Sequence, residues 1–310
     1  MLSTLSVVLP VFALILAGWL ARRVSVLGHG AASELSRFVV HLALPALLFD
    51  IVAHAGWAEI WQPRFIGAFG SGAALVFVAT IALRRRTRPL ADASIDGLNA
   101  AYANTGFLGF PLVFAALGQE ALGPTLVATI ITVCVLFAVA IILIEASLQA
   151  EARPLPLLRK VSNSLLRNPL LVAPVLGGLV PLVGLPIPAP VESFLKLLGG
   201  AAPPCALVAL GLFLAERRKV ATHGPQTVLL LVGLKLVVQP VITWVLATTV
   251  FGLPPSLTHA AVLLAALPTG TGPFMLAELY QREAGLTSGV LLASTVASVL
   301  TISGYLALIG

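Results

Sequence analysis

Two short stretches place polar and helix-breaking residues inside strongly apolar segments. Residues 104–111 read NTGFLGFP, and residues 267–274 read LPTGTGPF. Glycine and proline are the poorest helix formers, and proline also lacks a backbone donor. A helix broken at membrane depth leaves N–H and C=O groups unpaired, which is tolerated only within protein or beside a water-filled cavity. These residues therefore predict a site that binds an ion or a polar solute.

The freed helix ends and the side chains beside them give this site its chemistry. N-terminal helix ends carry partial positive charge, and C-terminal ends carry partial negative charge. The Asn104 carboxamide has donors suited to a carboxylate, and it is equally suited to capping the second half-helix. The candidate substrate-binding residues of the two stretches are Asn104, Thr105, Gly106, Gly109, Pro111, Pro268, Thr269, Gly270, Thr271 and Pro273.

The composition indicates which elements must position these residues. Hydrophobic residues make up 59% of the 310 residues and charged residues 10%, whereas soluble domains carry about 25% charge. Apolar runs of about 20 residues, the length that crosses a bilayer, recur along the chain. Arg22 and Arg23 follow the first run instead of preceding it, so we do not interpret this run as a cleaved signal peptide. We expect an all-α integral membrane protein without a large soluble domain.

The apolar runs predict ten spans, at roughly 4–21, 33–53, 64–83, 91–117, 121–148, 168–184, 192–214, 223–250, 257–279 and 286–309. The odd-numbered loops hold most of the 18 Lys and Arg, while the even-numbered loops hold only Arg64 and Lys196. Cytoplasmic loops collect Lys and Arg, so both termini are expected outside. The net charge of +6 is thus a topology signal, and nothing predicts a nucleic-acid partner.

The fifth loop divides the predicted spans into two sets of five. An odd number of spans forces the second set to start on the opposite side of the membrane, so the halves, if they are repeats, are inverted repeats. The two broken stretches fall in the fourth span of each half. Paired interruptions of this kind are the best sequence indicator of the binding site of a secondary transporter.

Several stretches resemble the auxin efflux carrier family, which holds the plant PIN carriers and bacterial malonate and malate carriers. AYANTGFLGFPL resembles the fourth-helix signature of this family, and ALPTGTGPFMLAELY resembles its ninth-helix signature. Three further stretches agree with family segments in the same order: RFVVHLALPALLF, LLRNPLLVAPVLG and AAPPCALVALGLFLA. The resemblance extends over nearly the whole chain.

The resemblance implies ten helices in two inverted five-helix repeats, similar to bile-acid symporters and sodium–proton antiporters, with broken helices 4 and 9 crossing. Asn104, Pro111, Pro268 and Pro273 would lie at the crossover. Elevator-type alternating access, a homodimer and a bacterial inner-membrane location are also implied. The implied divisions are 1–62 for scaffold helices 1–2, 63–149 for transport-domain helices 3–5, 150–221 for the linker with scaffold helices 6–7, and 222–310 for transport-domain helices 8–10.

Two charged residues inside the spans are candidates for electrostatic or coupling roles. Lys235 lies near the middle of span 8, where a cation costs about 2.5–3.5 kcal/mol and needs a partner. It either attracts an anionic substrate or neutralises the negative ends of the broken helices. Asp50 lies toward the outer end of span 2 and is either a proton carrier or an interface carboxylate. With no carboxylate expected near the middle of the crossover spans, an anion suits the site better than a cation.

The predicted function is secondary transport of a small organic anion across the bilayer, without a cofactor or metal and with a proton or sodium as the open choice of coupling ion. A sodium-coupled symporter of the bile-acid type is the alternative within this class, although spans 3, 4 and 9 offer almost no carboxylates. The plant carriers have an acid near the start of helix 3, whereas residues 64–83 contain none. An intramembrane enzyme would need HExxH, GxSxG or paired aspartates deep within the membrane, and the sequence has no HExxH, no GxSxG and no aspartate pair near the middle of a predicted span. A non-transporting sensor would need a signalling domain, for which the short loops leave no room.

Overall fold

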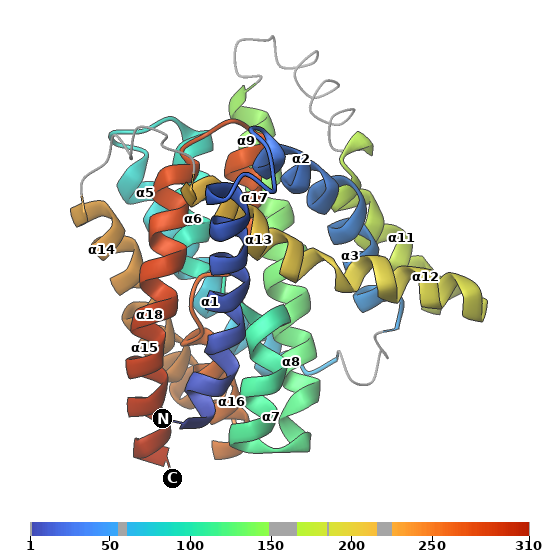
Figure 1. Cartoon of the computed structure of the whole chain (residues 1–310). Coiled ribbons are helices and arrows are strands. Elements are labelled where there is room, and N and C mark those ends of the chain that lie inside the picture. Colours follow the sequence, from blue (N-terminus) through green and yellow to red (C-terminus); the bar gives the residue numbers. More distant parts are fainter. Residues whose placement is uncertain (1, 55–60, 149–165, 185, 216–224, 310) are drawn as a thin grey trace.

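The computed structural model describes residues 2–54, 61–148, 166–184, 186–215 and 225–309. Within these ranges the fold is all helical, and the single extended contact is an isolated bridge between Ala103 and Thr269. Figure 1 shows the helices as one bundle from which α11 and α12 extend to one side, together with α3. The start of α1 and the end of α18 lie at the same end of the molecule.

The helices of the first half correspond to the first five predicted spans, with η denoting 3₁₀ or π segments. The second span is continuous from α2 to α3, and the fourth span is divided between α6 and η2. The bounds are α1 Leu2–Arg23, α2 Ala31–Phe38, η1 Val39–Ala43, α3 Leu44–Ala53, α5 Pro63–Arg84, α6 Leu90–Ala101, η2 Thr105–Gly109, α7 Phe110–Leu117, η3 Gln119–Ala121, α8 Leu122–Thr129, η4 Ile130–Leu136 and α9 Phe137–Leu148.

The helices of the second half correspond to the remaining predicted spans, and the ninth span is divided between α16 and α17. The bounds are α11 Pro169–Val183, α12 Ala189–Gly200, α13 Ala202–Ala215, α14 Pro225–Gly233, η5 Leu234–Val238, α15 Gln239–Val245, η6 Leu246–Val250, α16 Pro255–Ala265, α17 Gly272–Leu279 and α18 Ala284–Ile309. Six helical runs in the described residues are long and apolar enough to cross a membrane. Thr105–Leu117, Pro169–Val183 and Pro255–Ala265 are apolar but shorter.

Glycines bring the helices of the bundle into close contact, as small residues do in membrane proteins. A Cβ on Gly211 of α13 would lie 2.0 Å from the carbonyl oxygen of Ile15 in α1. A Cβ on Gly18 of α1 would lie 2.2 Å from the carbonyl oxygen of Val208. The backbones of α1 and α13 therefore touch at a distance that only glycine permits.

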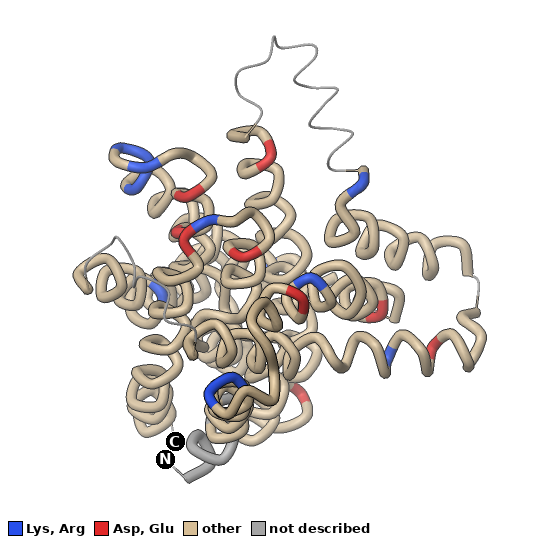
Figure 2. The backbone as a smooth tube through the Cα atoms, turned by 45° about the horizontal axis from the view of Figure 1, so that its top comes forward, with Lys and Arg blue, Asp and Glu red and all other residues tan. Residues whose placement is uncertain are grey.

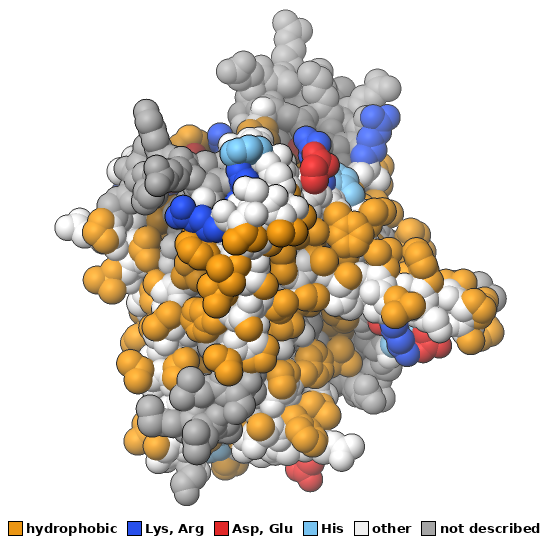
Figure 3. Space-filling model, viewed as in Figure 1, with side chains coloured by type: hydrophobic (Ala, Val, Ile, Leu, Met, Phe, Trp, Pro, Cys, Tyr) orange, Lys and Arg blue, Asp and Glu red, His pale blue; other side chains and the backbone are white. Residues whose placement is uncertain are grey.

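Figure 2 marks the positions of the charged residues along the backbone. On the face shown in Figure 3, most charged side chains lie toward the end opposite the chain termini, and a broad hydrophobic belt lies below them. Such a belt is what the hydrocarbon core of a bilayer requires. At the end opposite the chain termini, Arg84 and Arg88 pair with Asp96, at 2.8 and 2.9 Å. Arg88 also pairs with Glu283 at 2.8 Å, which joins the loop after α5 to the start of α18.

The remaining basic residues of the predicted topology are distributed as follows. Arg22, Arg23, Arg37 and Arg282 belong to described parts of the odd-numbered loops or to the helix ends beside them, and Arg167 lies just before α11. Arg153, Arg159, Lys160, Arg217, Arg218 and Lys219 lie outside the described residues.

Candidate functional site

The two broken helices meet through their extended segments. The helix α6 ends at Ala101 and η2 begins at Thr105, while α16 ends at Ala265 and α17 begins at Gly272. Between these ends the backbones run antiparallel. The N–H of Asn104 donates to the carbonyl of Pro268 at 2.9 Å, and the N–H of Gly270 donates to the carbonyl of Tyr102 at 3.0 Å. Each break thus satisfies part of the backbone that the other leaves unpaired.

The carbonyl ends of both first half-helices are capped from one neighbouring helix. Lys235 of η5 is fully buried, and its ammonium donates to the carbonyl of Ala265, the last residue of α16, at 2.6 Å. Gln239 of α15, also fully buried, donates through Nε2 to the carbonyl of Ala101, the last residue of α6, at 3.0 Å. The partial negative charge of these helix ends is therefore covered inside the protein.

Thr269 is tied into the packed interior behind the crossing. Its hydroxyl donates to the carbonyl of Asn99 at 2.8 Å, and its N–H donates to the hydroxyl of Ser294 at 3.1 Å. The Asn99 carboxamide in turn donates to the hydroxyl of Thr287 at 3.2 Å. These bonds join α6, the second break and α18, so Thr269 holds the crossing in place.

The amino ends of the second half-helices are arranged differently. The carbonyl of Asn104 accepts from the N–H groups of Leu108 and Gly109, at 3.1 and 3.2 Å, and so starts η2. The side chain of Asn104 makes no capping hydrogen bond. No partner for its carboxamide is found among the described residues. The first N–H groups of a helix have no acceptor within the helix, so η2 and α17 present donors and partial positive charge.

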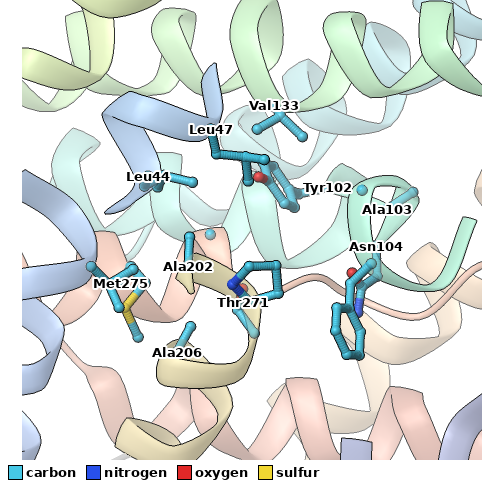
Figure 4. A pocket seen from close by; sticks show the side chains of 15 residues that line it. Leu44, Leu47, Tyr102, Ala103, Asn104, Val133, Ala202, Ala206, Thr271 and Met275 are labelled. Atoms are coloured by element: carbon cyan, nitrogen blue, oxygen red, sulfur yellow. The ribbon is translucent and has the colours of Figure 1, made fainter. Parts of the chain in front are cut away.

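A narrow cavity lies beside these amino ends (Figure 4). Its volume is about 50 Å³, enough for a few water molecules in this conformation. Its polar side chains are Tyr102, Asn104 and Thr271, and no carboxylate belongs to its described lining. The remaining lining residues are apolar or glycine and come from both sides of the crossing: Val39, Leu44, Leu47, Ala103, Gly106, Phe107, Val133, Ala202, Pro203, Ala206, Gly272 and Met275.

The ring of Tyr102 is held against the second break by the absence of side chains there. A Cβ on Gly270 would lie 2.8 Å from the ring, and one on Gly272 would lie 2.6 Å from it. On its other side the ring packs against Phe137, with 5.6 Å between ring centroids. Glycine at both positions is therefore what allows the ring to form a wall of the cavity.

Three of the predicted site residues, Asn104, Gly106 and Thr271, line this cavity. Most of the others are buried nearby without forming its wall, whereas Pro111 is exposed at the start of α7. The buried ones are Thr105, Gly109, Pro268, Thr269, Gly270 and Pro273.

The two charged candidates also lie away from the cavity wall. Lys235 caps α16, and this contact favours the interpretation that it neutralises a helix end. Asp50 lies 3.0 Å from His54, which approaches Glu192 of α12 at 3.8 Å. It therefore belongs to a polar contact between α3 and α12.

Sequence reasoning missed Tyr102, although it lies only two residues before the stretch that begins at Asn104, and an aromatic residue there was a usable signal. It also missed Asp96, a carboxylate in α6 that is 1% exposed. Because Asp96 is held by Arg84 and Arg88, its charge is already neutralised inside the protein. Leu47, Ala202 and Ala206 enter the site only through helix packing, for which the sequence gives no local signal.

Comparison with known proteins identifies the family of the chain. Residues 4–306 match the family model described as Membrane transport protein. A Rhizobium meliloti protein whose printed name is "Putative malonate transporter" is 31% identical over 306 residues, covering 97% of this chain and 94% of its own length. An "Uncharacterized transporter" of Methanothermobacter thermautotrophicus is 29% identical over 301 residues, covering 95% of each chain.

A plant protein matches over a shorter part. The auxin efflux carrier component 3a of Oryza sativa is 29% identical over 153 residues, which is 48% of this chain and 25% of the plant protein. The chain thus belongs to the membrane transport protein family that includes the auxin efflux carriers. It is a membrane transporter, and the names of the family and of these relatives indicate transport instead of catalysis.

Proposed function

We propose that the chain is a secondary transporter of a small organic anion, and that the cavity beside the paired breaks is its substrate site. This proposal rests on a difference between the two carbonyl ends and the two amino ends of the broken helices. Both carbonyl ends are capped by Lys235 and Gln239, whereas the first turns of η2 and α17 reach the cavity wall at Gly106 and Gly272. A site that exposes positive helix ends and hides negative ones favours an anion.

The lining supports a carboxylate with a short carbon skeleton. The Asn104 carboxamide and the Thr271 hydroxyl supply donors, while Leu44, Val133 and Met275 supply apolar contacts for a carbon chain. Malonate, named for the relative from Rhizobium meliloti, has this chemistry. Malate-like and auxin-like carboxylates belong to the same class and are further candidates. No cofactor is required beyond a coupling ion, which would be a proton or sodium.

For the architecture, we propose ten spans in two inverted repeats with helices 4 and 9 crossing. Residues 1–62 and the helices of 150–221 would form a scaffold, and residues 63–149 and 222–310 would form a transport domain. The cavity is lined from both divisions, by Leu47 and Ala202 on one side and by Asn104 and Thr271 on the other. Sliding of one division against the other, as in an elevator, would carry a bound anion across the bilayer. We further propose a homodimer in a bacterial inner membrane, with both termini outside.

Sodium-coupled symport is the second candidate, and buried oxygens favour it. The hydroxyl of Thr105 and the carboxamide oxygen of Asn99 have no hydrogen-bond partner in the described structure. Oxygen atoms of this kind suit a hard cation. A sodium ion bound by either oxygen would add positive charge near the broken helices.

A ligand screen of the purified chain tests the proposal. Ligands that bind the folded state raise its melting temperature by mass action. Malonate, malate and monocarboxylates are compared with organic cations of similar size, each in sodium and in choline buffer. We expect carboxylates alone to stabilise the protein, and sodium to add to the shift only if it is the coupling ion. Stabilisation by the cations and not by any carboxylate would overturn the assignment of an anion.

Binding must then be linked to transport. Proteoliposomes preloaded with the stabilising carboxylate are measured for exchange against the labelled compound outside. Exchange is expected for a carrier, whereas binding without any flux would show that the chain is a sensor.

A further inference from the structure

A second hollow lies away from the crossing, between α5 and the run from η4 to α9. Its volume is about 590 Å³, within the range of sites that hold a ligand of several hundred daltons. All of its lining residues are apolar or glycine except Arg85, at the end of α5. Val78 and Val135 on its rim are 61% and 55% exposed, so the hollow opens toward the surface that faces lipid.

Small residues form part of the wall of the hollow. Gly70 and Ala74 of α5 line it with little side-chain volume, and a Cβ on Gly70 would already be in van der Waals contact with Ile131, at 3.9 Å. From Gly70 to Arg85 the helix rises about 22 Å. One leaflet of hydrocarbon is roughly 15 Å thick, half of the core. The groove is therefore long enough to receive an acyl chain that starts at the membrane surface beside Arg85.

The arginines at the end of α5 differ in whether a carboxylate pairs with them. Arg84 and Arg88 share the carboxylate of Asp96. Arg85 and Arg86 are exposed, and neither has an ion pair among the described residues. Only Arg85 of these two lines the groove. An apolar groove headed by an uncompensated guanidinium complements a lipid with an anionic headgroup.

We propose that this groove binds one acyl chain of an anionic phospholipid, whose phosphate is held by Arg85. The site is separate from the substrate cavity, since the two share no lining residue. It joins α5 to η4 and α9 through the lipid, so a bound lipid would move with these helices.

Native mass spectrometry of the full chain in detergent tests this site with phosphatidylglycerol and phosphatidylcholine of identical acyl chains. We expect one retained phosphatidylglycerol per chain, preferred about fivefold over phosphatidylcholine, as one arginine near a headgroup provides. Arg85→Gln should abolish the preference. The matched control Arg86→Gln removes the same charge outside the groove and should keep it.

A second experiment fills the groove with a larger side chain. Ala74→Trp, or Gly70→Leu if the first variant does not fold, should lose retention of both lipids. The control Ala79→Trp changes an exposed alanine of the same helix outside the groove and should retain them. Equal loss of preference in Arg85→Gln and Arg86→Gln would overturn the proposal, because it indicates diffuse surface charge. Undiminished retention by both filled variants would also overturn it, as would a filled variant that dissociates a dimer while keeping its lipid.

Discussion

Replacing Asn104 gives the sharpest test of the substrate site, because its side chain contributes little to the fold. The carboxamide makes no capping bond, while the backbone carbonyl that starts η2 remains in any variant. Asn104→Ser and Asn104→Leu should therefore change the free energy of unfolding by less than about 1 kcal/mol. Leucine removes the donor to a charged group, and serine replaces the carboxamide with a hydroxyl on a shorter side chain. A hydrogen bond to a charged group contributes about 1.5–3 kcal/mol. Affinity for the carboxylate should fall roughly 10- to 100-fold.

Isothermal titration of the purified variants measures this loss, and thermal unfolding without ligand measures stability. Asn99→Ser is the matched control, because Asn99 is a buried asparagine of the same broken span that does not line the cavity. Its carboxamide donates to Thr287, so this variant should lose about 1–3 kcal/mol of stability. Affinity is compared in sodium-free buffer, where the Asn99 oxygen has no coupling ion to bind, and the folded variant should keep it there. Parental affinity in Asn104→Ser would refute the reasoning and leave Asn104 as a backbone element of the break.

Three further outcomes are expected. Lys235→Met leaves the carbonyl of Ala265 without its donor and should lower stability by about 1–3 kcal/mol, seen as a lower melting temperature; a parental melting temperature with weaker anion binding would instead assign Lys235 to substrate attraction. Gly272→Ala forces the ring of Tyr102 to move, because the added Cβ would lie 2.6 Å from it, so ligand affinity should fall. The control Gly304→Ala adds a Cβ with nothing within 4 Å and should leave affinity unchanged. Equal affinity in both variants would contradict the role of the ring. Thr87→Cys, in a chain lacking Cys134 and Cys205, should be protected from impermeant thiol reagents added outside whole cells, and ready labelling would reverse the proposed topology.

Much of the helical pattern could be predicted from the sequence, because its signals are local. Apolar length sets where a helix can lie in a bilayer, and helices do occupy all ten predicted ranges. Glycine and proline penalties likewise act within one helical turn, and the break after Ala265 contains Pro268 and Gly270. The break after Ala101 instead ends before Thr105, so Gly106 and Pro111 lie in the helical segments that follow it. The cavity wall was less predictable. Leu47 and Ala202 reach it from α3 and α13, and which helices face one another is decided by packing across the whole chain.

The residues that cap the broken helices, Lys235 and Gln239, were only partly predictable from the sequence. Lys235 and Gln239 stand four residues apart in an apolar span, and residues at this spacing share one face of a helix. The pair therefore indicated a polar face directed at protein, yet the sequence interpretation considered the lysine alone. Each polar group satisfies one carbonyl end, at Ala265 and at Ala101. A single helix face thus covers the negative ends of both breaks, and this one-sided capping is the asymmetry on which the proposed anion site rests.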